Sequence, residues 1–89
     1  IEPNYPNPFN PSTKIPLTVL KKEKISIVIY DSNGEFINEL YSGELSPGQF
    51  EFIWNGINQE NLKVTSGVYF CKIVQYGQFI SSRKMILLK

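Results

Sequence analysis

The stretch that decides the fold is Ile25 to Asp31, ISIVIYD, in which isoleucine occupies every second position at its start. Side chains of a β-strand alternate between the two faces of a sheet, so this spacing places three isoleucines on one face. Residues 31–34, DSNG, follow as a turn whose glycine suits a positive φ. Phe36 to Tyr41 then predicts a returning strand, and residues 25–41 are therefore expected to form a hairpin.

Further strands are predicted on both sides of this hairpin. Ile15, Leu17 and Val19 alternate with other residues, among them Pro16, which belongs at a strand start or on an edge strand because proline lacks an N–H. The other predicted strands are Gln49 to Trp54, Leu62 to Val64, Val68 to Val74 and Phe79 to Leu88. About seven short strands without a helical stretch predict an all-β antiparallel β-sandwich.

A proline-rich segment precedes the strands. Residues 4–13, NYPNPFNPST, cannot form a helix or a regular strand, because their prolines lack an N–H and restrict the preceding residues. We expect residues 1–13 to be an extended lead-in with Phe9 as its large apolar side chain. The whole chain, 1–89, is expected to be one domain, and Ile1 to Pro3 looks like the cut edge of a longer protein.

The composition limits the kinds of catalytic and metal site that the chain can form. The chain has no histidine, which is the commonest general base and transition-metal ligand, and Cys71 is its single cysteine. Residues 1–60 contain all eight carboxylates and four lysines, a net charge of −4, whereas residues 61–89 contain five cations and no acid. A basic half can meet an acidic partner or an anionic surface, although any single lysine is more typical of a solvated edge or loop.

The aromatic residues Phe50, Phe52 and Trp54 share one face of their strand. They could form a platform on which sugars stack, or they could fill the sandwich interior. The opposite face bears Gln49 and Glu51, so packing in the core is the favoured interpretation. For Trp54, which lies at the strand end, both interpretations stay open.

No other cluster indicates chemistry. The acids are dispersed over turns and outward positions, without a nucleophile and base together, so we expect no enzyme activity, no cofactor and no metal site. The loop Asn55 to Asn61 is rich in oxygen atoms, but it lacks the dense aspartates of calcium loops, and a hydrogen-bonded turn is expected. Cys71 shares a strand face with Tyr69 and Ile73, which predicts a buried thiol.

The last strand allows two interpretations. Met85 to Leu88 is continuously apolar and is preceded by the cations Arg83 and Lys84. A strand that is apolar on both faces is usually covered on both, as an ordinary closing strand would be. It could instead be accessible at the chain terminus, protected from aggregation by its cations and open to a partner strand.

Six sequence segments, in their order along the chain, resemble the type A C-terminal sorting domain of proteins exported by the bacterial type IX secretion system. The matching elements are Tyr5 to Phe9, Ile25 to Asp31, Gly34, Phe50 to Trp54, Ser66 to Tyr69 and Arg83 to Lys89. The immunoglobulin-like module of flagellar hook-capping proteins is similar as well. The resemblance implies an immunoglobulin-like sandwich at the C-terminus of a larger cargo protein.

The family's function is targeting. The resemblance implies passage through the periplasm and across the outer membrane to the cell surface or the medium. The implied partners are an outer-membrane translocon, a sortase-like peptidase and the upstream cargo domain, with no nucleic acid and no transmembrane segment. Surface attachment commonly follows.

Three candidate signal motifs follow from the resemblance. They are Asn7, Pro8 and Phe9; Gly67, Val68 and Tyr69; and Lys84, Met85, Ile86, Leu87, Leu88 and Lys89. The chain departs from the family pattern at Asn55, Asn61 and Cys71. Asn61 stands where the family often has glycine, and we expect it to keep the turn because asparagine tolerates positive φ well.

Two other functions remain open from the sequence. One is an accessory carbohydrate-binding module of a secreted enzyme, which requires exposed aromatic rings in a row. The other is a structural spacer or assembly module. The end of the chain at Lys89, directly after an apolar strand, favours sorting.

Overall fold

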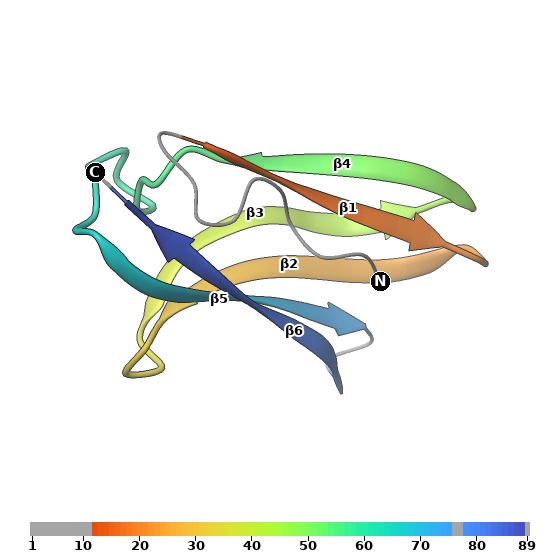
Figure 1. Ribbon diagram of the computed structural model, residues 1–89. Helices are drawn as coiled ribbons and strands as arrows, with labels where there is room; N and C mark the ends of the chain where they lie inside the picture. The colour runs from red at the N-terminus through yellow and green to blue at the C-terminus, as the bar shows by residue number, and fades with distance from the viewer. Residues whose placement is uncertain (1–11, 76–77, 89) are drawn as a thin grey trace.

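The protein is a sandwich of two antiparallel β-sheets, seen in a computed structural model that describes residues 12–75 and 78–88 (Figure 1). The six strands are β1 (Thr13–Val19), β2 (Glu23–Asp31), β3 (Phe36–Leu45), β4 (Gly48–Trp54), β5 (Gly67–Gln75) and β6 (Gln78–Leu87). One sheet has the order β1-β4 and the other has the order β3-β2-β5-β6. The predicted fold class is confirmed.

The strand bounds differ from the prediction in several places, since β2 begins at Glu23 instead of Ile25 and β3 ends at Leu45 instead of Tyr41. The expected strand Leu62 to Val64 is reduced to a single β-bridge between Ile57 and Lys63, which leaves six strands within the described residues instead of about seven. Thr13, the last residue of the expected lead-in 1–13, begins β1 and is fully buried. Residues 1–11 of that lead-in lie outside the described residues.

The predicted hairpin of residues 25–41 is confirmed, with an added irregularity. β2 pairs with β3, and the register shifts twice, after Ile27 and after Ile29. Each shift inserts one extra residue on β3, Leu40 in the first case and Ile37 in the second. Both of these side chains pack against the core, so the bulges turn more apolar residues inward than strict alternation would allow.

The core lies between the two sheets. Its fully buried side chains come from five strands, and the largest of them is Trp54. The buried cluster consists of Ile15, Leu17, Val19, Ile25, Ile27, Ile29, Leu45, Trp54, Tyr69, Cys71, Ile73, Met85 and Leu87. Over residues 12–75 and 78–88 there is no helix long and apolar enough to cross a membrane.

Candidate functional site: the paired ends of β5 and β6

Two of the three candidate signal motifs lie side by side. β5 begins with the second motif, and β6 ends in the third, and the two strands are antiparallel neighbours (Figure 1). Their register is Gly67↔Leu87, Val68↔Ile86 and Tyr69↔Met85. Segments that are far apart in the sequence therefore form one short surface at the same end of the sheet. Asn7, Pro8, Phe9 and Lys89 lie outside the described residues.

The inward half of this surface belongs to the core. Tyr69, Met85 and Leu87 are buried. The Tyr69 ring meets the Trp54 ring edge-on with centroids 5.1 Å apart, and its hydroxyl donates a hydrogen bond of 2.7 Å to the Thr65 carbonyl. These positions stabilise the sandwich, and an external partner cannot reach them without unfolding it.

The outward half can be reached. Val68 and Ile86 are half-buried, Lys84 is exposed, and Leu88 is 52% exposed. β6 thus fits neither sequence interpretation fully, because one of its faces is covered and the other is open. Gly67 has φ +155°, a conformation that other residues rarely adopt, so glycine is required where β5 begins.

Arg83 is not the surface cation that the sequence suggests. It is only 9% exposed, and its Nη2 donates a hydrogen bond of 3.1 Å to the Pro16 carbonyl on β1. This contact joins the last strand of one sheet to the first strand of the other. The predicted edge role of Pro16 fits as well, because β1 belongs to a two-stranded sheet and pairs there with β4 on one side only. The basic surface of residues 61–89 therefore does not include Arg83.

The Cys71 thiol is buried, as predicted, and lies opposite Arg83 in the β5–β6 register. Burial raises the pKa of the thiol from 9.0 to about 12, although the Arg83 charge opposes the shift. The thiol is therefore protonated at neutral pH and poorly nucleophilic.

The aromatic stripe on β4 packs inward, as favoured, but its order of burial is the reverse of the expectation. Trp54 is 1% exposed, and its Nε1 donates a hydrogen bond of 2.9 Å to the Ile57 carbonyl. Phe50 and Phe52 are half-buried at the margin of the core, with Phe52 against Tyr41 at 5.4 Å between ring centroids. The buried indole offers no face on which a sugar could stack.

The loop after β4 is held by its asparagines. Asn58 Oδ1 accepts hydrogen bonds of 2.9 Å from the Glu60 amide and 3.0 Å from the Leu62 amide. Asn61 has φ 65°, as expected for a residue that replaces glycine in the turn. The predicted hydrogen-bonded turn is confirmed, and the side-chain oxygen of Asn58 is directed at backbone amides.

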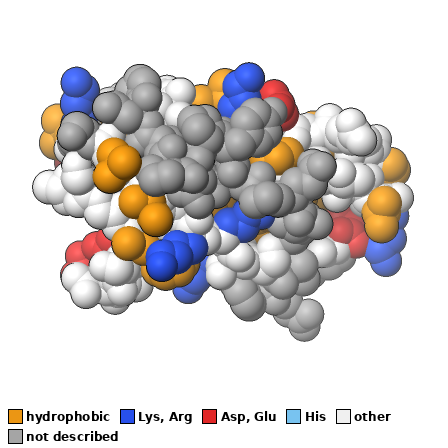
Figure 2. Space-filling view, viewed as in Figure 1, with side chains coloured by type: hydrophobic (Ala, Val, Ile, Leu, Met, Phe, Trp, Pro, Cys, Tyr) orange, Lys and Arg blue, Asp and Glu red, His pale blue; other side chains and the backbone are white. Residues whose placement is uncertain are grey.

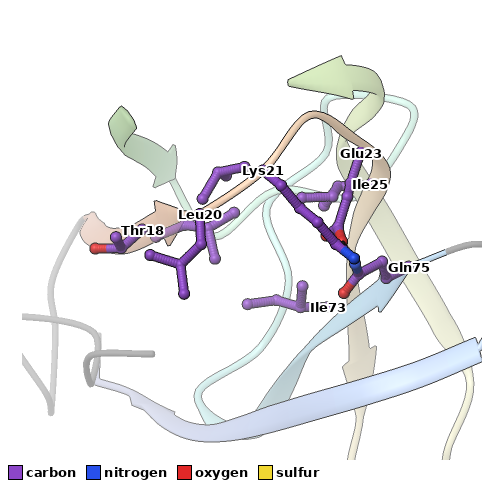
Figure 3. A pocket seen from close by; sticks show the side chains of 9 residues that line it. Thr18, Leu20, Lys21, Glu23, Ile25, Ile73 and Gln75 are labelled. Carbon is purple, nitrogen blue, oxygen red and sulfur yellow. Dashed lines mark ion pairs between the residues drawn. The ribbon is translucent and has the colours of Figure 1, made fainter. Parts of the chain in front are cut away.

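A cavity that sequence reasoning missed opens at the other end of the sandwich, beside the connection from β1 to β2. It has a volume of about 470 Å³. Its lining consists of Leu17, Thr18, Val19, Leu20, Lys21, Glu23, Ile25, Ile73 and Gln75. Figure 3 shows Leu20 and Ile73 pointing toward each other across it. The sequence signal was Leu20, an apolar side chain in a charged turn, which is 87% exposed.

These features define a class of protein, an immunoglobulin-like β-sandwich module. The chain belongs to the FlgD Ig-like domain family, whose model matches residues 14–78. The predicted relation to the immunoglobulin-like module of hook-capping proteins is thereby confirmed, whereas the assignment as a sorting domain stays a prediction. A search of curated proteins finds no match.

Two solved structures are similar to the fold. Dimeric latent PorU from Porphyromonas gingivalis aligns with a TM-score of 0.72 and 20% identity, over 96% of this chain and 9% of that chain. FlgD from Xanthomonas campestris, studied for the hook capping essential for flagellar assembly, aligns with a TM-score of 0.64 and 20% identity, over 90% of this chain and 58% of that chain. This chain thus spans less than two thirds of either protein, and at such identity the likeness shows the fold alone.

Proposed function

We propose that this module is a non-catalytic targeting signal that directs a larger cargo protein across the bacterial outer membrane by the type IX secretion system, with attachment at the cell surface. The observation that carries the proposal is the pairing of the second and third candidate motifs at one end of β5 and β6. A translocon that reads a folded domain needs a fixed surface, and a register between two strands provides one.

The surface that would be read is the outward half of the paired ends. It combines the half-buried Val68 and Ile86 with the exposed Lys84 and Leu88. Apolar contacts of this kind supply affinity, while the lysine adds association rate and orientation. The partners in this proposal are the outer-membrane translocon and a sortase-like peptidase.

An export assay tests this proposal. Residues 1–89 are fused behind a periplasmic reporter in a host that has the secretion system, and the reporter at the cell surface is measured by its sensitivity to external protease. Deleting 84–89 would be uninformative, because Met85 and Leu87 are core residues and their loss unfolds the domain. Substitution of the exposed pair, Lys84→Glu with Leu88→Ser, is the sharper change.

We expect the double variant to lower surface delivery while its melting temperature stays close to that of the parent domain. The matched control is Lys24→Glu with Leu62→Ser, which changes an exposed lysine and a 60% exposed leucine elsewhere on the surface. Undiminished delivery of a folded Lys84→Glu, Leu88→Ser variant would contradict the proposal.

The carbohydrate-binding alternative loses its expected platform, because Trp54 is buried. The structural alternative is favoured by one observation, the match to the FlgD Ig-like domain family. A spacer would tolerate every substitution on the outward surface as long as the domain remains folded, so the same assay separates it from a targeting signal.

A further inference from the structure

The outer face of the four-stranded sheet has a row of side chains that crosses every strand. Tyr30 of β2 is paired with Phe36 of β3 on one side and with Phe70 of β5 on the other. Phe70 is in turn paired with Lys84 of β6. Directly paired residues share a face of an antiparallel sheet, so Phe36, Tyr30, Phe70 and Lys84 form one line, here called the outer row.

The row faces away from the core. The neighbours of Tyr30 and Phe70 along their strands, Ile29 and Cys71, are fully buried in the core, so Tyr30 and Phe70 point to the opposite side. Phe36 is 51% exposed. Its ring meets the Tyr30 ring edge-on, with centroids 6.3 Å apart at an interplanar angle of 83°.

The adjacent line on the same face is also ordered. Val28 of β2 pairs with Lys72 of β5. Val28 is only 7% exposed, although it lies outside the core cluster, so this outer face is itself well packed. Lys72 Nζ lies 4.5 Å from the centroid of the Tyr30 ring, which fixes a cation in the middle of the face.

The charge of this face is uneven. Glu39 is paired with Val28 on the β3 side, whereas Lys72 and Lys84 lie on β5 and β6. Within residues 12–75 and 78–88, no ion pair is found between a carboxylate and Lys72. Figure 2 shows hydrophobic side chains and a basic side chain close together over the part of the surface where β5 and β6 lie in Figure 1.

The size of the face limits its partner. Four strands about 4.8 Å apart give the outer row a length of about 14 Å, which an extended segment of about five residues can cover. A stable protein–protein interface needs about 800 Å² on each side, whereas the outer row is a single line of four side chains. An exposed apolar patch of a few hundred Å² is nevertheless a frequent mark of a binding site.

We propose that the outer row is a docking surface for a short acidic segment of another protein, whose apolar side chains lie against Phe36, Tyr30 and Phe70 and whose carboxylates meet Lys72 and Lys84. Glu39 repels the acidic end from β3 and so sets the direction of the segment. The proposal goes beyond the targeting function, since the aromatic residues belong to none of the candidate signal motifs and only Lys84 is shared.

Two other partners fit less well. A sugar ring stacks on an open, flat aromatic face, but the Tyr30 and Phe36 rings are nearly perpendicular and Lys72 lies over the Tyr30 ring. A membrane surface requires apolar side chains that project beyond their surroundings, whereas Tyr30 and Phe70 are half-buried in a sheet.

The experiment is a titration of the isotope-labelled chain, residues 1–89, followed by amide chemical shifts. The probe is a synthetic peptide in which aspartate alternates with leucine, and the matched peptide replaces each aspartate with lysine. We expect saturable shifts concentrated at Val28, Tyr30, Phe36, Phe70 and Lys72 with the acidic peptide only. Lys72→Glu should raise Kd about tenfold, the effect of about 1.4 kcal/mol, while Lys24→Glu leaves Kd unchanged.

Phe70→Ser provides a second test, and its folded state is checked by the dispersion of the spectrum. The proposal is overturned if neither peptide binds, if both bind equally, or if the shifts lie on β1 and β4. It is also overturned if the same amides shift on dilution of the free protein, which indicates a second copy, or with anionic vesicles but not with the peptide. None of these results depends on export, so this proposal and the targeting function fail separately.

Discussion

Truncation of Trp54 should remove a large part of the stability of the domain, because this side chain packs between β4 and the opposite sheet. The indole is 1% exposed, packs edge-on against Tyr69, and donates a hydrogen bond to the Ile57 carbonyl. Replacing a buried tryptophan with alanine costs about 3–5 kcal/mol, and the lost hydrogen bond adds about 1 kcal/mol. A domain of this size is stabilised by about 5–10 kcal/mol in total.

Trp54→Phe separates the two contributions. The Ile57 carbonyl also accepts a hydrogen bond of 3.0 Å from Asn38 Nδ2, so it keeps a donor when the indole is removed. We therefore expect Trp54→Phe to lower the unfolding free energy by only about 1 kcal/mol through the lost hydrogen bond and by about 1 kcal/mol through the smaller ring. A loss of about 2 kcal/mol lowers the melting temperature of a domain this small by about 8–16 °C.

The assay is urea unfolding at constant pH, followed by circular dichroism because Trp54 is the only tryptophan. Leu62→Ala, at a 60% exposed position, is the control and should change the unfolding free energy by less than about 0.5 kcal/mol. If Trp54→Ala costs less than about 1 kcal/mol, the sandwich is not organised around this residue and the reasoning fails.

Four further predictions concern the pH dependence of stability, two backbone positions and one loop side chain. The unfolded Cys71 thiol ionises above its ordinary pKa of 9.0, while burial keeps the folded thiol protonated up to a pKa of about 12. The contribution of this thiol to the unfolding free energy should thus fall by about 1.4 kcal/mol per pH unit above pH 9 and be constant below it. Urea unfolding measured at several pH values should show this loss in the parent protein and not in Cys71→Ala. Gly67→Val should cost about 1–3 kcal/mol, since φ +155° strains any side chain; a melting temperature equal to that of the parent would refute this. Asn61→Gly should be nearly neutral and Asn61→Val clearly destabilising, whereas Asn58→Ala should lose about 1–2 kcal/mol through its two amide contacts, as measured by thermal unfolding.

The sequence predicted most of the fold because alternation reports directly which side chains share a face. It identified the inward isoleucines of β2 and the inward Tyr69, Cys71 and Ile73 of β5. It also identified the turn at Asn61. It failed at the seventh strand, because the segment 62–64 has strand-forming residues but only Lys63 finds a bridging partner.

The candidate site was only partly predictable. The resemblance selected residues 67–69 and 84–89 separately, and the structure adds that the described parts of the two motifs are paired. The structure also separates the motif residues that are buried in the core from those that a partner can reach. This separation depends on which face of β6 meets the other sheet. Arg83 was misjudged because its acceptor is the Pro16 carbonyl, 67 residues away in the sequence.

By itself, the sequence determined most of the β-strands, the inward faces of β2 and β5, and the turn at Asn61, because the period of two and the backbone limits of proline, glycine and asparagine are local properties. Beyond the β2–β3 hairpin, only the tertiary structure decided which strands are neighbours and in what register. Those choices depend on packing between distant segments, and they bury Trp54 against Tyr69, join Arg83 to β1 and align three aromatic residues across the outer face.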